Sequence, residues 1–417
     1  MKQDEQLPID DESNKRSLRS TMDLKSHEQV SNGPIKIQVS SNNVDDNIDF
    51  NPAIAALRKA KRIVIVTGAG ISCGAGIPDF RSSDGLFSSL RSEYKLNCSG
   101  KELFDGAVYR DLKSVNIFHE MIKKLHELSD NAVPTDFHYF LSKLAKDSKL
   151  LRLYTQNIDF LETRLEGLQT CTPLPQSAPW PTSIPLHGTL EVARCTRCPF
   201  VRPFHPDLFE KDGLTACPEC RTQNEVRRIA GKRLIMEGCL RPRIVLYNEG
   251  HPDSEAIGAV CSQDLKSRPD CLIVAGTSCK IPGVKRIIKE MSNSVHRQKG
   301  SVIWLNHDAP TKEFANLCDI IIEGDCQTAI RIMKPSLEAS RWKPKVHSTT
   351  TSVAKKRTSG QAKLTATTKI TKTESPAKKV KKERSPLESI NKVMKPVEML
   401  ERGVKPEVEY SDFSKRS

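Results

Sequence analysis

The sequence predicts an α/β protein in which a doubly wound parallel sheet of the Rossmann-like type carries a small cysteine-rich insert between disordered ends. Three observations predict this fold class. Short Val- and Ile-rich runs alternate with helix-like periods over residues 51–334. One of these runs passes directly into a glycine-rich loop at 68–74. Two Cys-x-x-Cys pairs lie in a stretch without long apolar runs, 187–235.

The strands are predicted from six apolar runs, because continuous Val/Ile runs between helices indicate a parallel sheet that is covered on both faces. These runs cover residues 62–68, 150–155, 244–249, 271–276, 301–306 and 319–324. Between them, apolar residues at helical spacing predict one helix over 115–128 and another that starts at 134–135. In such a sheet we expect the ligand at the carboxyl ends of the strands.

The domain boundaries follow from composition. The sheet domain is predicted over 51–186 and 236–334, with the insert at 187–235 between its two parts. Residues 1–50 carry 10 acidic against 6 basic side chains. Residues 335–417 carry 20 Lys and Arg against 9 Asp and Glu, a net of +11 within a total of +14 for all 417 residues. Both ends have few large apolar groups to offset chain entropy, so we expect both to be disordered.

The cellular compartment is predicted from membrane-span and export signals, from the cysteine content and from a basic run. No apolar run is long enough to span a bilayer, and the N-terminus lacks the apolar stretch of a signal peptide. Thirteen cysteines without an export signal indicate a reducing compartment. The run PAKKVKKERSP at 376–386 is of the nuclear-import type, which predicts a nuclear protein with an import receptor as partner. A solvated charged tail is the alternative, and non-specific nucleic-acid contact through phosphates is compatible with it.

Four cysteines of the insert form two pairs. Cys195 and Cys198 make the first pair, Cys217 and Cys220 the second, and 18 residues separate them. This spacing is typical of a zinc site with four thiolates. Because four thiolates leave no open coordination position, we expect one structural zinc ion without a part in catalysis. A zinc ribbon that binds nucleic acid, or four thiols without metal, are the alternatives.

The glycine-rich loop suits a dinucleotide. Gly68, Gly70 and Gly74 follow a predicted strand and precede a predicted helix, where backbone amides can hold a pyrophosphate. The spacing GxGxxxG is one residue longer than the usual GxGxxG, so a tight turn without a ligand is the alternative. No acidic residue falls at the end of a second strand to hold a ribose.

Five short motifs follow one another along the chain, the fourth just before the cysteine pairs. They are GAGIS (68–72), GIPDFR (76–81), TQNID (155–159), HG (187–188) and GTS (276–278). Over about residues 51–334 the chain thus resembles the sirtuin family of NAD-dependent protein deacylases. Further segments are similar to a fungal nuclear branch of this family: LRPRIVLYNEGHP (240–252), GTSCKIPGVKRIIKE (276–290) and a Pro-rich insert at 168–185. Members of that branch deacetylate a lysine in the globular core of histone H3, with roles in chromatin silencing, genome maintenance and the response to DNA damage.

The resemblance implies three catalytic residues. His187 matches the family's base, which takes a proton from a ribose hydroxyl, a task that suits an imidazole with a pKa near ~6.5. Asn157 matches the residue that holds the ribose and a water near the reacting carbon. Asp159 and Ile158 match those that hold the nicotinamide amide.

The other implied contacts come from the same loops and from the ends of later strands. Phe80 would shield the cleaved face from returning nicotinamide, and Arg81 would bind phosphate, with a surface ion pair as the alternative for Arg81. The implied cofactor-binding residues are Gly68, Ala69, Gly70, Ile71, Ser72, Ala75, Ile77, Pro78, Asp79, Phe80, Arg81, Phe87, Gln156, Asn157, Ile158, Asp159, Gly276, Thr277, Ser278, Asn306, His307, Asp308 and Cys326.

The resemblance also places an acetylated peptide as a strand between segments 246–250 and 280–283, where backbone pairing supplies affinity. The residues involved are Leu246, Tyr247, Asn248, Glu249, Lys280 and Ile281. Two departures from the family pattern leave the peptide register and the acyl preference open. Tyr247-Asn248-Glu249 replaces the usual Phe-Gly-Glu, and Pro282, which cannot donate a ladder hydrogen bond, lies in the other segment.

The expected partners are acetylated histones or other acetyl-lysine proteins, within chromatin, and no membrane. Two alternatives remain open. The first is mono-ADP-ribosyl transfer to protein, or removal of a longer acyl group. The second, from another class, is a catalytically silent chromatin scaffold; the presence of His187, Asn157 and Asp159 argues against it.

Overall fold

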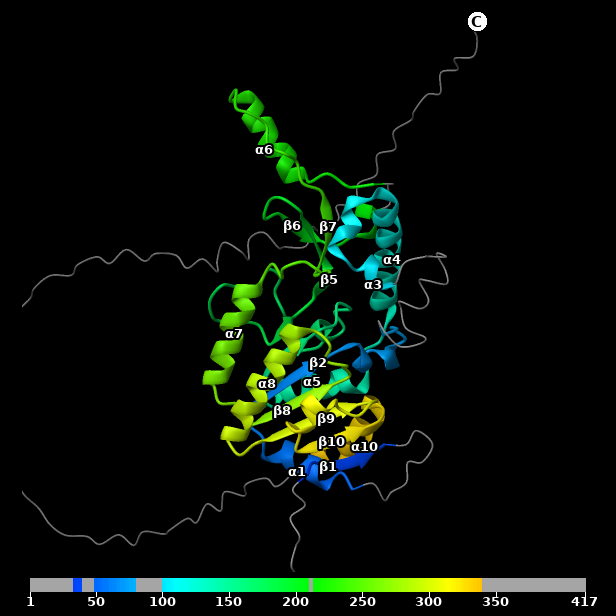
Figure 1. Cartoon of the computed structure of the whole chain (residues 1–417), viewed down its shortest axis with the longest axis vertical. Helices are drawn as coiled ribbons and strands as arrows, with labels where there is room; N and C mark the ends of the chain where they lie inside the picture. The colour runs from blue at the N-terminus through cyan, green and yellow to red at the C-terminus, as the bar shows by residue number, and fades with distance from the viewer. Residues whose placement is uncertain (1–32, 40–48, 80–99, 210–212, 340–417) are drawn as a thin grey trace, which may run out of the picture. The chain divides into compact units, whose positions relative to one another are not determined.

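The computed structural model describes residues 33–39, 49–79, 100–209 and 213–339 (Figure 1). A seven-stranded sheet with the order β1-β10-β9-β8-β2-β3-β4 forms its centre, and every neighbouring pair in it is parallel. Its strands are β1 (Ile35–Gln38), β2 (Ile63–Thr67), β3 (Leu150–Thr155), β4 (Ser183–Pro185), β8 (Cys271–Ala275), β9 (Ser301–Asn306) and β10 (Ile320–Glu323). The predicted fold class, a Rossmann-like parallel sheet with a small inserted module, is confirmed.

Helices cover both faces of this sheet, as the uninterrupted apolar strands require. In β2, Ile63 and Ile65 pack on one face against helices α1 (Asn51–Lys59), α5 (Asp136–Lys146) and α10 (Cys326–Ala339). Val64 and Val66 point to the other face, against α7 (Ser254–Lys266), α8 (Pro282–Arg297) and α9 (Lys312–Ala315). Since all five residues of β2 are buried, this strand lies in the middle of the core.

A three-stranded antiparallel sheet with the order β6-β5-β7 forms the smaller part. Its strands are β5 (Gly188–Cys195), β6 (Val201–Pro203) and β7 (Leu240–Ile244) (Figure 1). Helix α6 (Pro218–Ile229) begins directly after Cys217 and contains Cys220. Helices α3 (Gly100–Leu103) and α4 (Leu112–Asn131) bring apolar side chains to the same core as this sheet. The small sheet and its helical cover thus draw on residues on both sides of the insert predicted at 187–235.

Five short 3-10 turns lie between these elements in the described residues: η1 (Ala69–Ile71), η2 (Cys73–Ala75), η3 (Gly106–Arg110), η4 (Glu162–Arg164) and η5 (Pro206–Phe209). Within the described residues, no helix combines the length and the apolar character that a bilayer crossing requires.

The structure differs from the sequence prediction in several elements. Strand β1 lies inside the segment 1–50 for which disorder was predicted, and it pairs with β10. The run 244–249 is not a strand of the parallel sheet, because only its first residue belongs to a strand, β7 of the antiparallel sheet. Helix α10 continues to Ala339, past the predicted start of the tail at 335. Residues 1–32, 40–48 and 340–417 lie outside the described residues.

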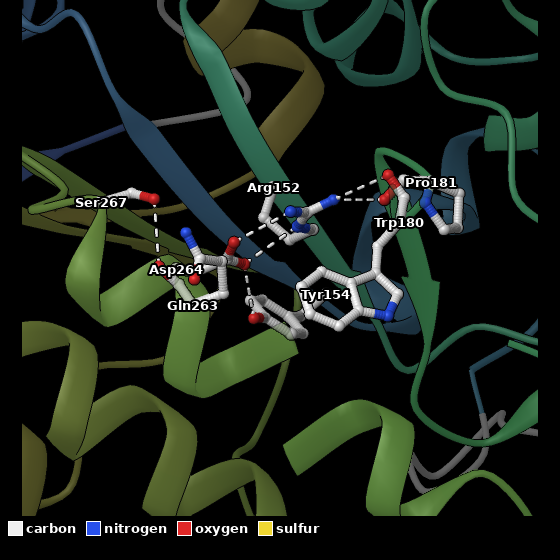
Figure 2. Close-up of polar contacts among 7 residues, drawn as sticks. All are labelled: Arg152, Tyr154, Trp180, Pro181, Gln263, Asp264 and Ser267. Carbon is white, nitrogen blue, oxygen red and sulfur yellow. Dashed lines mark hydrogen bonds and ion pairs between the residues drawn. The ribbon is translucent and has the colours of Figure 1, made fainter. Parts of the chain in front are cut away.

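The Pro-rich segment 168–185 is held at the β4 edge of the sheet by a buried ion pair (Figure 2). Arg152 of β3 donates from Nε and Nη2 to the two carboxylate oxygens of Asp264 on α7, at 2.9 Å each. Its Nη1 donates to the main-chain carbonyls of Trp180 and Pro181. Tyr154 donates its hydroxyl to Asp264 at 2.7 Å. One guanidinium therefore joins a strand, a helix and the segment that leads into β4.

Candidate active site

Two glycine-containing loops pack against each other at the carboxyl ends of β2 and β8. The amide of Gly68 donates to Ala275 O at 3.1 Å, and that of Gly70 donates to Gly276 O at 2.9 Å. A Cβ added to Gly70 would lie 2.7 Å from the Cα of Gly276, and Gly276 has φ +61°. The glycines at these positions are thus required by the packing of the two loops. This gives the motif a structural reason beside the phosphate contact that it predicts.

The chain after β2 forms the turns η1 and η2 in place of the predicted helix. The carbonyl of Ile71 accepts hydrogen bonds from Thr135 Oγ1 at 3.0 Å and from Gln327 Nε2 at 2.9 Å. Gln327 also accepts from the amide of Phe137 at 2.9 Å. Hydrogen bonds from the start of α5 and the first turn of α10 to the Ile71 carbonyl therefore fix the position of the loop. The sequence motifs gave no signal for either Thr135 or Gln327.

The loop after β3 connects the two glycine loops. Gln156 donates from its side chain to Thr67 O at 3.0 Å and to Thr277 Oγ1 at 2.8 Å, which ties together the ends of β2, β3 and β8. Asn157 is 4% exposed and donates from Nδ2 to Ser72 Oγ at 3.1 Å. Its buried Oδ1 finds no donor among the described residues. A buried acceptor of this kind fits a hydroxyl or a water brought by a ligand.

His187 follows β4 by two residues and stands beside the same loop. Its Nδ1 lies 2.9 Å from Gln156 O. Because a carbonyl oxygen only accepts, Nδ1 carries the proton and the ring's lone pair lies on Nε2. The next residue, Gly188, has φ +79°, and a Cβ there would lie 2.1 Å from Arg243 O. Glycine after the histidine is therefore required by the close approach of β5 and β7.

Asp159 is buried at 5% exposure and follows Asn157 by two residues in the same loop. Its Oδ1 accepts from the amide of Leu161 at 3.2 Å, and Ser72 forms a further side-chain hydrogen bond to it. Burial raises the pKa of this carboxyl group, and these two hydrogen bonds oppose the rise. Ile158 beside it is buried as well. The structure thus brings Asn157, Asp159 and Ser72 into one buried hydrogen-bonded group.

Several predicted cofactor residues lie farther along the carboxyl edge of the sheet. Asn306 ends β9 and accepts from the amide of Thr277 at 2.6 Å, so its amide group orients the loop of Thr277 and Ser278. His307 and Asp308 beside it are fully exposed and contact each other at 3.4 Å. Cys326 begins α10 and is buried, which raises the pKa of its thiol to about 12 and keeps it protonated.

The segment that follows η2 leads out of the described residues. Ala69, Ile71 and Ala75 lie in the two turns, and after them come buried Ile77 and half-buried Pro78 and Asp79. Phe80, Arg81 and Phe87 lie outside the described residues, so their predicted roles stay predictions.

The predicted peptide-binding residues are partly engaged within the protein. Tyr247 donates its amide to Phe104 O at 2.7 Å and accepts from the amide of Gly106 at 2.9 Å. Glu249 pairs with the buried Arg241 at 2.5 and 3.0 Å. The carbonyl of Leu246 accepts from the amide of Glu249 in a turn, and Asn248 has φ +62°. Lys280 and Ile281 directly precede α8. One edge of the segment 246–249 is therefore occupied by the protein itself.

The four predicted zinc ligands form one cluster in the small domain. The sulfur atoms of Cys195, Cys198, Cys217 and Cys220 all lie within 4.8 Å of one another. Two of their separations are 3.7 Å, between Cys195 and Cys220 and between Cys198 and Cys217. Zinc–sulfur bonds of about 2.3 Å in a tetrahedron place sulfurs about 3.8 Å apart. The cluster therefore fits one zinc ion.

Backbone groups around the cluster support thiolates. The amides of Arg197 and Cys198 donate to the sulfur of Cys195 at 3.3 and 3.4 Å. A Cβ on Gly238 would lie 2.3 Å from that sulfur, so only glycine fits here. These contacts hold the first knuckle in the conformation that a metal requires.

Comparison with known proteins gives a consistent result. A sequence profile described as the Sir2 family matches residues 68–283. The chain is 69% identical over 373 residues to "NAD-dependent protein deacetylase hst4" of Schizosaccharomyces pombe, with 89% of each protein covered. It is 44% identical over 284 residues to "NAD-dependent histone deacetylase HST4" of Saccharomyces cerevisiae, with 65% of this chain and 75% of that protein covered.

A solved structure has the same fold. The "crystal structure of a Sir2 homolog-NAD complex" matches 70% of this chain and 94% of its own, with a TM-score of 0.52 and 23% identity. At this identity the likeness concerns the fold alone.

Proposed function

The chain belongs to the Sir2 family, and from this premise we propose that it is an NAD-dependent protein-lysine deacetylase that acts on histones. One observation carries the proposal. The carbonyl of Gln156 holds His187 in the tautomer with a basic Nε2, and Asn157, the residue after Gln156, has a buried Oδ1 without a donor among the described residues. The relatives with 69% and 44% identity are named as a protein deacetylase and a histone deacetylase.

The chemistry divides between the cofactor and the protein. When bound, NAD would supply an electrophilic ribose carbon, with nicotinamide as the leaving group and the acetyl oxygen of the substrate lysine as the nucleophile. His187 Nε2 accepts the proton of a ribose hydroxyl. Asn157 Oδ1 accepts a hydrogen bond from the ribose or from a water at that carbon. Asp159 accepts one from the nicotinamide amide. With one water consumed, the products are free lysine, nicotinamide and O-acetyl-ADP-ribose.

The loops around these residues are suited to bind the dinucleotide. Gly68, Gly70 and Gly276 lie at the carboxyl ends of parallel strands, where a ligand of such a sheet binds. Thr277 and Ser278 are proposed as phosphate contacts, and Asn306 as a contact of the adenosine ribose. The zinc ion would hold the small sheet without touching the reacting atoms, because its four thiolates fill its coordination.

We further propose a core lysine of histone H3 as the target, and a nuclear location with a role in chromatin silencing. Support comes from relatives named as histone deacetylases and from the basic run at 376–386, which lies outside the described residues. Lys378, Lys379, Lys381 and Lys382 are the proposed import signal. Charge reversal of these four lysines should spread the protein into the cytoplasm, and unchanged nuclear residence would contradict the proposal.

One assay separates the candidate activities. The protein is incubated with labelled NAD and acetylated histones, and nicotinamide release, deacetylated peptide and labelled protein are measured. Deacetylation with stoichiometric nicotinamide is expected, and His187→Ala is the matched control. Transfer of label to protein without deacetylation would indicate an ADP-ribosyltransferase. Neither nicotinamide nor product would indicate a scaffold.

A further inference from the structure

The buried carboxyl group of Glu162 has no role in the mechanism above. It lies in η4 at 1% exposure and accepts from Thr155 Oγ1 at 2.6 Å. Thr155 Oγ1 in turn accepts from the amide of Asn157 at 3.1 Å. A hydroxyl has one proton to donate, so the bond to Glu162 fixes the direction of this chain. The backbone of Asn157 is thereby tied to Glu162 through one side chain.

A second buried carboxyl group, that of Asp159, is linked to the side chain of Asn157 through Ser72. Asp159 is hydrogen-bonded by Ser72, and Ser72 Oγ accepts from Asn157 Nδ2 at 3.1 Å. Glu162 therefore supports the main chain of Asn157, and Asp159 supports its side chain. Both carboxyl groups lie three residues apart at the end of β3.

Two buried carboxyl groups in one site resist ionising together, because each charge opposes the other in a low-dielectric interior. Burial, followed by the charge of Asp159, raises the pKa of Glu162 to about 8. Glu191 on β5 adds a smaller contribution in the same direction. Arg164 is the cation that acts on Asp159 and Glu191. Helix α5 also packs here and presents Ser142, whose hydroxyl donates to Glu166 O.

A small cavity adjoins Glu162. Its lining includes Thr155, Asn157, Glu162 and Thr189 of β5 but not Asp159, and its volume of about 10 Å³ is near the least that holds one water.

We propose that Glu162 is a positioning residue: its protonated carboxyl group, through Thr155, holds Asn157 in place for the ribose. The proposal rests on the proposed function of Asn157. When Glu162 loses its proton, a buried negative charge arises three residues from the buried Asp159, and the support of Asn157 is disturbed. Activity should therefore fall on the alkaline side through Glu162, independently of His187.

The test compares the wild type with Glu162→Gln and Glu162→Ala from pH 6 to pH 10. Glutamine keeps an acceptor for Thr155 and an N–H donor in place of the acid proton, but it cannot ionise. We expect the wild type to lose kcat/KM for NAD above about pH 8, by about tenfold at pH 9 and about thirtyfold at pH 9.5. At pH 7, the kcat/KM of E162Q should match that of the wild type within about twofold. E162Q should lack the alkaline loss, which for an ionising group approaches tenfold per pH unit. E162A, without the acceptor for Thr155, should be impaired at every pH.

Two results would overturn the proposal: the same alkaline loss in E162Q as in the wild type, or an inactive E162Q that retains the wild-type melting temperature. An infrared difference spectrum between pH 7 and pH 10 tests the proton of Glu162 without activity. The wild type should lose the carbonyl band of a buried carboxylic acid, and E162Q should not. Absence of this band in the wild type refutes a protonated Glu162 even if E162Q does not fold. A wild type with the band but no deacetylation refutes the proposed function alone.

Discussion

Replacing Asp264 by asparagine should destabilise the protein strongly, although this residue is remote from the proposed chemistry. The side chain of Asp264 is 1% exposed, and it is the only carboxylate that pairs with Arg152 among the described residues. Asparagine keeps the volume but removes the charge, and its NH2 group would face a guanidinium N–H. Arg152, whose side chain is 11% exposed, would then be a buried cation without a counter-charge, and its remaining acceptors are one amide oxygen and the carbonyls of Trp180 and Pro181.

The expected loss follows from these contacts. Breaking a buried ion pair by removing one partner costs about 3–5 kcal/mol in the free energy of unfolding. Because the two carbonyls remain as acceptors for Arg152, we expect the lower end, about 3 kcal/mol. At about 2–4 °C per kcal/mol for domains of 150–250 residues, the melting temperature should fall by roughly 6–12 °C. The segment 168–185 loses its anchor on α7 and should become more sensitive to proteolysis.

Denaturant unfolding and thermal melting measure this loss, and two controls interpret it. Glu290→Gln breaks the exposed i,i+4 pair with Arg286 on α8 and should change the stability little, because solvent screens such a pair. The double variant Arg152→Met with Asp264→Leu removes both charges and should recover much of the stability, because replacing both partners of a buried pair by apolar groups is often neutral. The reasoning is refuted if Asp264→Asn costs no more than Glu290→Gln, or if the double variant is less stable than the single one.

Four further outcomes are expected. His187→Ala should retain zinc and melting temperature but lose deacetylation by at least ~100-fold in steady-state assays; near-normal turnover would contradict its role. Cys195→Ser should release zinc, measured by metal analysis, and lower activity, and a metal-free protein with full activity would argue against this. Gly188→Ala should unfold at clearly lower denaturant concentration, because its Cβ would lie 2.1 Å from a backbone oxygen at φ +79°. A chain that ends at Ala339 should deacetylate a short peptide as well as the full chain; loss of activity would mean that the tail contributes to the enzyme.

The sequence predicted the centre of the sheet well and its edges poorly. Strands in the middle are apolar along their whole length, as in β2, where all five residues are buried, so composition alone identifies them. The edge strand β1 buries only Ile37 of its four residues, within a polar and acidic segment. β4 has three residues and ends in Pro185. Such strands exist because a neighbouring strand offers hydrogen bonds, and that neighbour cannot be read from local composition.

The candidate site shows the same division between local and distant information. The four cysteines, His187 and Asn157 stand in short motifs, so their positions could be predicted, and the clustered sulfur atoms confirm a four-cysteine zinc site. The support of the glycine loop could not be predicted. Thr135 and Gln327 reach Ile71 across 64 and 256 positions of sequence. Their roles depend on where α5 and α10 pack, which no motif encodes.

One strand explains why a metal that touches no reacting atom should still matter for catalysis. β5 begins at Gly188, directly after His187, and ends at Cys195, the first zinc ligand. The paired stretch of β7 between these two ends has only four steps, so at about 3.3 Å per residue the ends lie roughly 13 Å apart. Both ends pair with β7, Gly188 with Ile244 and Cys195 with Leu240. Loss of zinc frees the far end of this strand and, with it, the pairing that places the backbone next to the base. Activity should therefore fall through kcat, as His187 loses its fixed position, before NAD binding at the separate glycine loops is affected.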